Sequence, residues 1–134
     1  MNFNNFTIKS QEAVQEAVNL VQSRGQQAIE PEHLMAGLLK VGENVTNFIF
    51  QKLGINGQQI ETVLDRQIAS LPKVSGGEAY LSRSANEVLQ KALEVSKELG
   101  DEYVSLEALL LALLNVKSTV ATILKDAGLT DKEL

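Results

Sequence analysis

The chain has 134 residues, of which 12 are Lys or Arg and 17 are Asp or Glu, and it carries a net charge of −5. This length allows one ordinary domain, and a 44% apolar fraction is typical of a soluble globular protein. The absence of Cys and the single His exclude disulfides, thiol nucleophiles, zinc–thiolate sites and paired histidine ligands. The acidic balance, with scattered basic residues, argues against nucleic acid as a partner.

The apolar runs and the beginning of the chain predict no membrane contact. The longest run, residues 108–114, is far shorter than the roughly 18 residues that a membrane span needs. The first residues contain neither the basic nor the apolar segment of a secretory signal. We therefore expect a cytoplasmic protein.

Apolar residues at three- and four-residue spacing predict four helices in the first half of the chain. These helices run over residues 7–24, 31–42, 44–54 and 56–70. Gly25, Gly42 and Gly54 follow the first three as natural stops. Asn44 and Asn56 are the expected N-caps of the third and fourth helices.

The helical pattern starts again after a segment that contains a proline and paired glycines. A shift of 75 residues places Gly25 on Gly100 and Glu32 on Glu107, and Thr130 is a possible cap for a last helix. The expected single domain, 1–134, consists of repeat 1 (7–70), a linker (71–80) and repeat 2 (82–134). Neither repeat can bury its apolar face alone, so the predicted fold is all-α, a pseudo-two-fold duplicated four-helix repeat.

The motifs of common catalytic sites are missing from the sequence. It contains no phosphate-binding loop, no dinucleotide fingerprint and no nucleophile elbow, so we expect no enzyme activity from this chain. His33 lies among carboxylates but has no nucleophile at a fixed spacing, which favours a structural role near a helix N-terminus. Glu32 and Glu107 share the second position of their helices, where a carboxylate either stabilises the helix end or faces a bound peptide.

A wide apolar stripe follows the first helix of repeat 2. At about 100° per residue it covers roughly 160° of the helix. Its members are Val88, Leu89, Ala92, Leu93, Val95 and Leu99. One-sided packing needs a narrower stripe, so Leu93 and Val95 at its flanks predict either an exposed apolar groove or extra core contact with the other repeat.

The segment Ile29–Leu39 and its second copy, Val104–Leu109, resemble the Clp-N double repeat at the N-terminus of Clp-type AAA+ unfoldases. Phe6–Thr7 and the segment Leu71–Gly76 are most similar to the ClpB-type disaggregase branch of that family. Protease-linked members usually repeat Glu-His in the second copy, where this chain has Glu107–Ala108.

The resemblance implies a domain that binds unfolded or aggregated polypeptide and is tethered to a homohexameric, ATP-driven ring. The substrate-binding residues that it implies are Thr7, Asp101 and Glu107, with an apolar groove at Leu89, Val95 and Ala108. The chain is then expected to be a fragment without a cofactor or metal of its own, because ATP and Mg²⁺ belong to the ATPase modules. A co-chaperone system is a further implied partner. Thr7 is equally well placed as an N-cap.

Three other functions stay open at this point. In the same fold, the chain could be the adaptor-docking domain of a protease-linked unfoldase. It could also be a purely structural helical module that mediates self-association. A small acid–base enzyme built on His33 is the third alternative.

Overall fold

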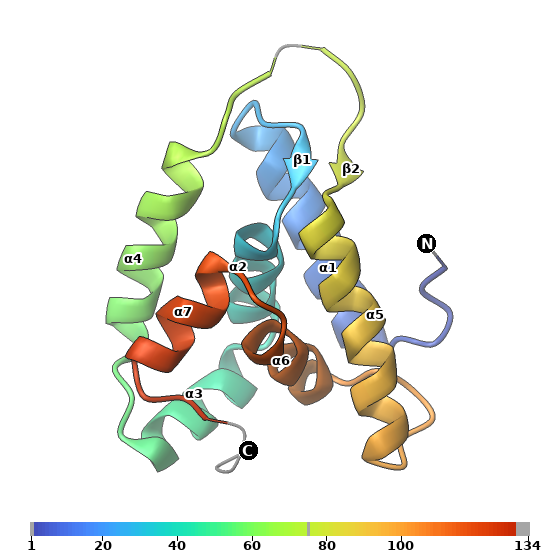
Figure 1. The fold of residues 1–134 in the computed structure, drawn as a ribbon, viewed down its shortest axis with the longest axis vertical. Helices are drawn as coiled ribbons and strands as arrows, with labels where there is room; N and C mark the ends of the chain where they lie inside the picture. Colours follow the sequence, from blue (N-terminus) through green and yellow to red (C-terminus); the bar gives the residue numbers. More distant parts are fainter. Residues whose placement is uncertain (1, 75, 131–134) are drawn as a thin grey trace.

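Seven helices and one pair of short strands make up the part of the chain that the computed structural model describes, residues 2–74 and 76–130 (Figure 1). In chain order they are α1 (Ile8–Ser23), β1 (Ala28–Ile29), α2 (Pro31–Val41), α3 (Glu43–Leu53), α4 (Gly57–Ser70), β2 (Tyr80–Leu81), α5 (Arg83–Glu98), α6 (Leu106–Asn115) and α7 (Thr119–Asp126). The all-α prediction is confirmed, with the small strand pair as an addition. The helix expected to begin at Thr130 falls on residues outside the described part.

Most helix ends lie where the sequence places them. The side chains of Thr7 and Asn56 accept hydrogen bonds from backbone N–H groups in the first turns of α1 and α4, at 3.1 and 3.2 Å. Gly25 and Gly54 follow α1 and α3 with φ of +66° and +68°, the left-handed region that favours glycine.

The start of α3 differs from the prediction. Asn44 is not its cap but already the second residue of the helix, and Gly42 is the capping residue. The carbonyl of Gly42 accepts the N–H of Thr46 at 3.0 Å, so helical bonding begins two residues earlier than expected. Gly42 thus ends α2 and begins α3, and a side chain there would collide with Leu106 and the carbonyl oxygen of Leu38.

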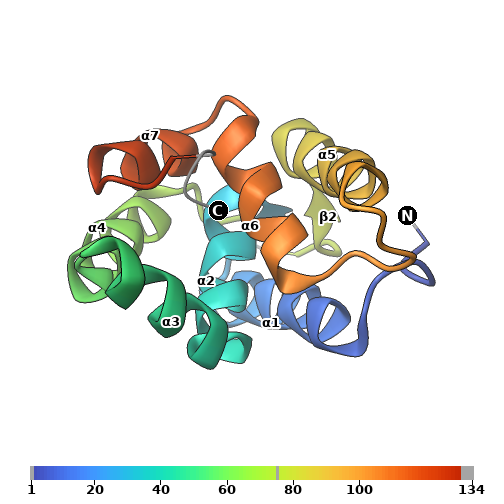
Figure 2. The same ribbon diagram turned by 90° about the horizontal axis from the view of Figure 1, so that it is seen from below.

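Helices α2 and α6 lie at the centre of the molecule, with α1 and α5 against them on one side and α4 and α7 on the other (Figure 1, Figure 2). The buried residues of α6 are Leu106, Ala108, Leu109, Leu110, Ala112, Leu113 and Leu114. A helix enclosed by neighbours must be apolar nearly all round, which explains the long leucine run. Among the described residues no single helix could span a membrane by length and hydropathy, and α6 and α7 meet that test only as a pair bent by 99°.

The contact between α1 and α2 is tightest at Gly37. A Cβ atom there would collide with the carbonyl oxygen of Ala13 and lie 3.2 Å from the backbone nitrogen of Ala17. Both alanines are buried, at 1% and 0% exposure. Small residues on both helices therefore let the two backbones approach each other closely.

Two short parallel pairings connect the beginning of the chain with its second half. Phe6 pairs with Val104, and β1 pairs with β2, with Ile29 opposite Leu81. The N–H of Thr7 donates to Val104 O and the N–H of Ser82 donates to Ile29 O, both at 3.0 Å. The segment before α1 thus pairs with the loop before α6, and the segment before α5 pairs with the loop before α2. These two reciprocal pairings hold the two halves together.

Candidate functional site

The Phe6–Val104 pairing places Thr7 beside the segment that carries Asp101 and Glu107, three of the six residues that the resemblance singled out. Thr7 follows Phe6 directly, and Val104 lies midway between Asp101 and Glu107 in the loop that leads into α6. The pairing is secured from both sides, because Val104 N–H donates to Asn5 O at 2.7 Å and its carbonyl accepts the Thr7 N–H. Thr7 therefore lies close to the loop that carries Asp101 and leads to Glu107, although about a hundred positions separate them in sequence.

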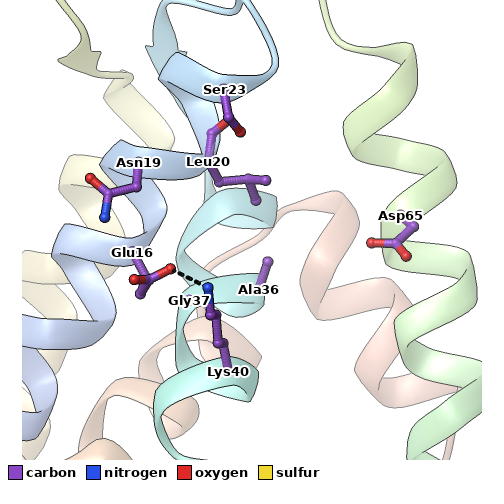
Figure 3. A pocket seen from close by; sticks show the side chains of 8 residues that line it. All are labelled: Glu16, Asn19, Leu20, Ser23, Ala36, Gly37, Lys40 and Asp65. Carbon is purple, nitrogen blue, oxygen red and sulfur yellow. Dashed lines mark hydrogen bonds and ion pairs between the residues drawn. The ribbon is translucent and has the colours of Figure 1, made fainter.

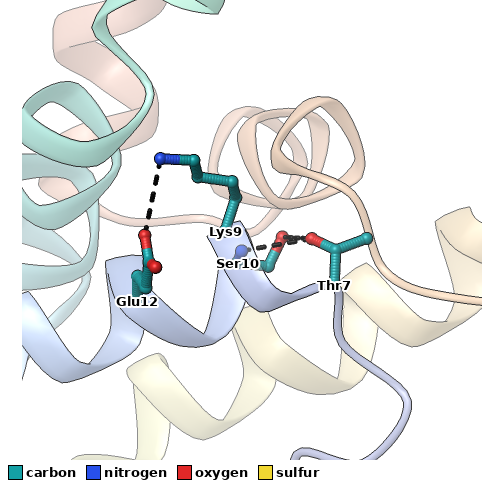
Figure 4. A network of polar contacts seen from close by, with 4 residues as sticks. All are labelled: Thr7, Lys9, Ser10 and Glu12. Carbon is teal, nitrogen blue, oxygen red and sulfur yellow. Dashed lines mark hydrogen bonds and ion pairs between the residues drawn. The ribbon is translucent and has the colours of Figure 1, made fainter.

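Thr7 is the N-cap of α1, as the sequence predicts (Figure 4). Its hydroxyl oxygen accepts the Ser10 N–H at 3.1 Å, and the hydroxyl donates to Ser10 Oγ at 2.9 Å. Lys9 and Glu12 form an exposed ion pair of 3.6 Å on the same helix turn. The proton of the Thr7 hydroxyl is thus engaged within the helix start, and one oxygen lone pair is left for another donor.

Asp101 and Glu107 are both exposed, and neither has an ion-pair partner within the part of the chain that the structure describes. The backbone fixes the position of Asp101, because its N–H donates to Ser96 O at 2.9 Å and its carbonyl accepts from Ser96 Oγ at 3.1 Å. Glu107 lies in the first turn of α6, where backbone N–H groups favour a carboxylate.

Three large apolar side chains are exposed beside these polar groups. Ile8 follows Thr7 and is 76% exposed, while Leu99 and Tyr103, next to Asp101, are 52% and 47% exposed. We use the name Thr7 face for the surface formed by Thr7, Ile8, Leu99, Asp101, Tyr103 and Glu107. Tyr103 was not singled out from the sequence, although an aromatic residue in a short polar loop is a usable signal.

The expected apolar groove is not open at its three named positions. Leu89 and Ala108 are fully buried and Val95 is 6% exposed, because α6 packs against this side of α5. Of the two alternatives for Val95, an exposed flank is therefore wrong, and Val95 belongs to the hydrophobic core. Leu93 is partly buried against the same core.

His33 is buried in a network of hydrogen bonds. Its Nδ1 accepts the Glu30 N–H at 2.9 Å, so Nε2 carries the proton and donates to Gln26 Oε1 at 2.7 Å. The Gln26 amide donates in turn to Ile68 O at 2.6 Å. Burial of the ring, with Arg24 nearby, lowers the pKa of His33 to about 4. These contacts support the structural role and offer no reacting group.

The two carboxylates at equivalent helix positions have different surroundings. Glu32 is only 7% exposed, and burial raises its pKa above the usual value, although its own backbone N–H opposes the shift. Glu107 is exposed to solvent. Within residues 2–74 and 76–130, no group of three His, Asp or Glu side chains could hold a metal ion.

Comparison with known proteins places the chain among chaperone domains. Residues 5–127 match the family model of the Clp repeat (R) N-terminal domain. Over all 134 residues the chain is 80% identical to the chaperone protein ClpB of Bacteroides thetaiotaomicron and 51% identical to that of Porphyromonas gingivalis. It spans 16% of the length of each relative.

Solved structures share the fold. The Hsp104 N-terminal domain from Candida albicans matches with a TM-score of 0.84 and 22% identity, over 97% of this chain and 86% of that one. The ClpV N-domain in complex with a VipB peptide matches with a TM-score of 0.75 and 20% identity, over 94% and 81% of the two chains. At these identities the likeness concerns the fold alone.

Proposed function

Because the chain belongs to the Clp repeat N-terminal domain family, we propose that it binds unfolded or aggregated polypeptide on behalf of an ATP-driven protein disaggregase. The observation that carries this proposal is the Thr7 face, where exposed apolar side chains stand beside two unpaired carboxylates. The Phe6–Val104 pairing holds this face in one shape.

The chemistry of the Thr7 face suits weak binding of many sequences. Exposed Ile8, Leu99 and Tyr103 offer apolar contact that does not depend on a particular partner sequence. Asp101 and Glu107 favour segments that carry Lys or Arg and disfavour acidic ones. Client segments that expose both apolar and basic residues are therefore the expected ligands.

The remaining parts of the proposal concern the whole protein. Its relatives are chaperones about six times longer than this chain, which covers 16% of them. We infer that ATP and Mg²⁺ bind to ATPase modules outside this chain, that those modules form a homohexameric ring, and that a co-chaperone system cooperates with it in the cytoplasm.

The test is a titration of the 134-residue chain with a permanently unfolded, carbamidomethylated protein, whose blocked cysteines carry no added charge, followed by backbone NMR. We expect shifts around Thr7, Asp101 and Tyr103, and we expect the double variant Asp101→Asn/Glu107→Gln to bind several-fold more weakly. Glu78→Gln/Asp126→Asn, which removes two exposed carboxylates outside the face, is the matched control for the lost charge. An absence of shifts at the Thr7 face with millimolar client would refute the proposal.

A second candidate function is docking of a specific adaptor. The ClpV N-domain of the same fold was solved with a VipB peptide, which favours recognition of a defined partner segment. Capture of a folded adaptor, together with no binding of unfolded clients, would support this alternative. Sedimentation distinguishes client binding from a structural module that mediates self-association, since the client-binding proposal expects this chain to be a monomer.

A further inference from the structure

A second surface lies in a groove that follows α2 between α1 and α4 (Figure 3). It consists of two adjoining hollows of about 400 and about 370 Å³ that share Ala36, Lys40 and Asp65. No residue of the Thr7 face lines either hollow. We call this surface the α2 groove.

The α2 groove has an apolar floor. The short side chain of Ala36 leaves space above α2. Leu20 and Leu39 line the floor as partly buried residues, and buried Leu64 lines it from α4. A bound side chain could therefore lose water on one side without displacing the core.

The rim of the α2 groove is acidic. Four carboxylates line the two hollows, and Lys40 is the one cation among the lining residues. The carboxylates are Glu16, Glu43, Glu61 and Asp65. Lys40 Nζ lies 3.1 Å from Glu16, and the other three have no ion-pair partner within the described residues. Asp65 stands on α4 across the groove from that pair (Figure 3).

We propose that the α2 groove binds a short segment of a partner polypeptide that carries Lys or Arg between apolar residues. The apolar side chains of the segment lie on Leu20 and Leu39, and its cations face Asp65 and Glu61. Three uncompensated carboxylates favour a cationic occupant and repel an acidic one. The α2 residues that line the groove, from Ala36 to Lys40, span about 6 Å at 1.5 Å per helical residue, which matches about two extended residues.

Lys40 has a defined role in this proposal. In the empty groove its ammonium group neutralises Glu16, and its side chain is 73% exposed and free to turn away. An incoming cation competes with it for the same carboxylate. Removing the Lys40 charge should therefore strengthen binding, whereas removing a rim carboxylate should weaken it.

The test uses the 134-residue chain and a ten-residue acetylated peptide with four lysines and two leucines, followed by NMR and calorimetry at low salt. We expect shifts at Ala36, Gly37 and Leu39 and no binding of the peptide in which glutamates replace the lysines. Asp65→Asn/Glu61→Gln should weaken binding about fivefold, and Lys40→Gln should strengthen it about twofold, as expected for partly exposed charges. Glu78→Gln should leave the affinity within about 1.5-fold.

Each alternative result overturns the inference. Equal binding of the acidic peptide, or no effect of the Asp65→Asn/Glu61→Gln exchange, would show that the rim carboxylates do not select a cationic segment. Shifts confined to the Thr7 face would refute the α2 groove while leaving the proposed function intact. Shifts in the α2 groove alone would support the α2 groove and argue against peptide binding at the Thr7 face. The two proposals can therefore fail independently of each other.

Discussion

The N-terminal half (residues 7–70) and the C-terminal half (residues 82–130) share the order of their first three helices but differ in how those helices pack. In the N-terminal half, α1 and α2 approach closely at Gly37, where a side chain has no room. The equivalent residue in the C-terminal half is Ala112, which is fully buried between α5 and its neighbours. The close approach of α1 and α2 thus depends on a glycine that the C-terminal half does not have at the equivalent position.

The two halves also differ in the loop before the central helix. Gln26 and His33 of the N-terminal half form a buried polar network that reaches Ile68 at the end of α4. Their equivalents are Asp101, which is exposed, and Ala108, which is buried and apolar. The loop before α2 is hydrogen-bonded to the core through Gln26, whereas the loop before α6 exposes the Asp101 carboxylate to solvent. A duplicated scaffold can therefore keep one copy for stability and leave the other for binding.

The largest expected effect comes from filling the close contact in the N-terminal half. Gly37→Leu should lower the free energy of unfolding by about 4 kcal/mol, because its side chain would collide with the α1 backbone at Ala13. Ala112→Gly, which gives the other half the residue found at position 37, should cost about 1 to 2 kcal/mol, from helix propensity and the lost burial of one methyl group. Urea unfolding measures the free energy of unfolding of both variants. A Gly37→Leu protein as stable as the unsubstituted chain would contradict the close approach of α1 and α2.

The next effect is a pH dependence that originates in the N-terminal half, at His33. The pKa of His33 is lowered to about 4 in the folded protein, so below its ordinary value of 6.5 the unfolded chain binds the proton more readily. The contribution of the neutral His33 ring to the free energy of unfolding is fully present above about pH 6.5. It should fall by about 3 kcal/mol as the pH drops to about 4. Glu32, whose pKa is raised, acts in the opposite direction and offsets part of the loss at the acidic end.

Urea unfolding between pH 7 and pH 4 tests this dependence, and His33→Ala, which copies the apolar residue of the other half, should flatten it. The chain contains one His, so its ring resonances report the folded-state pKa directly. A ring that titrates near pH 6.5 in the folded protein would contradict the buried, neutral network.

The sequence predicted the features that each half forms locally, but not the contacts that depend on how the two halves pack together. Helical periodicity and glycine stops located the helices, because both are local properties of the chain. The strand pairing at Phe6 and Ile29 could not be predicted, since it joins segments that only the packed halves bring together. The two alternatives for Val95 could not be separated for the same reason: a wide apolar stripe does not tell whether a neighbour covers its flank. Thr7 was assigned correctly as a cap because capping is local.

A smaller effect compares the caps of the two long outer helices. Thr7→Ala should cost about 1.5 kcal/mol and Ser82→Ala about 1 kcal/mol. Both side chains accept a first-turn N–H, but only Thr7 also donates to a buried hydroxyl, that of Ser10. Thermal unfolding compares the two, with Thr7→Ser and Ser82→Thr as controls that keep each cap. A larger loss at Ser82 would show that the extra Thr7 bond adds nothing to stability.

The smallest effect concerns the surface charges of the two halves. Lys40→Gln breaks the pair with Glu16, whose side chain is only 30% exposed, and should cost about 0.5 kcal/mol. Arg83→Gln in the other half breaks a pair at 94% and 54% exposure and should cost about 0.2 kcal/mol or less. Raising the salt concentration should remove the difference, because screening acts on both pairs. A cost at Lys40 that survives high salt would mean that its aliphatic chain, packed along the α2 groove, stabilises the fold rather than its charge.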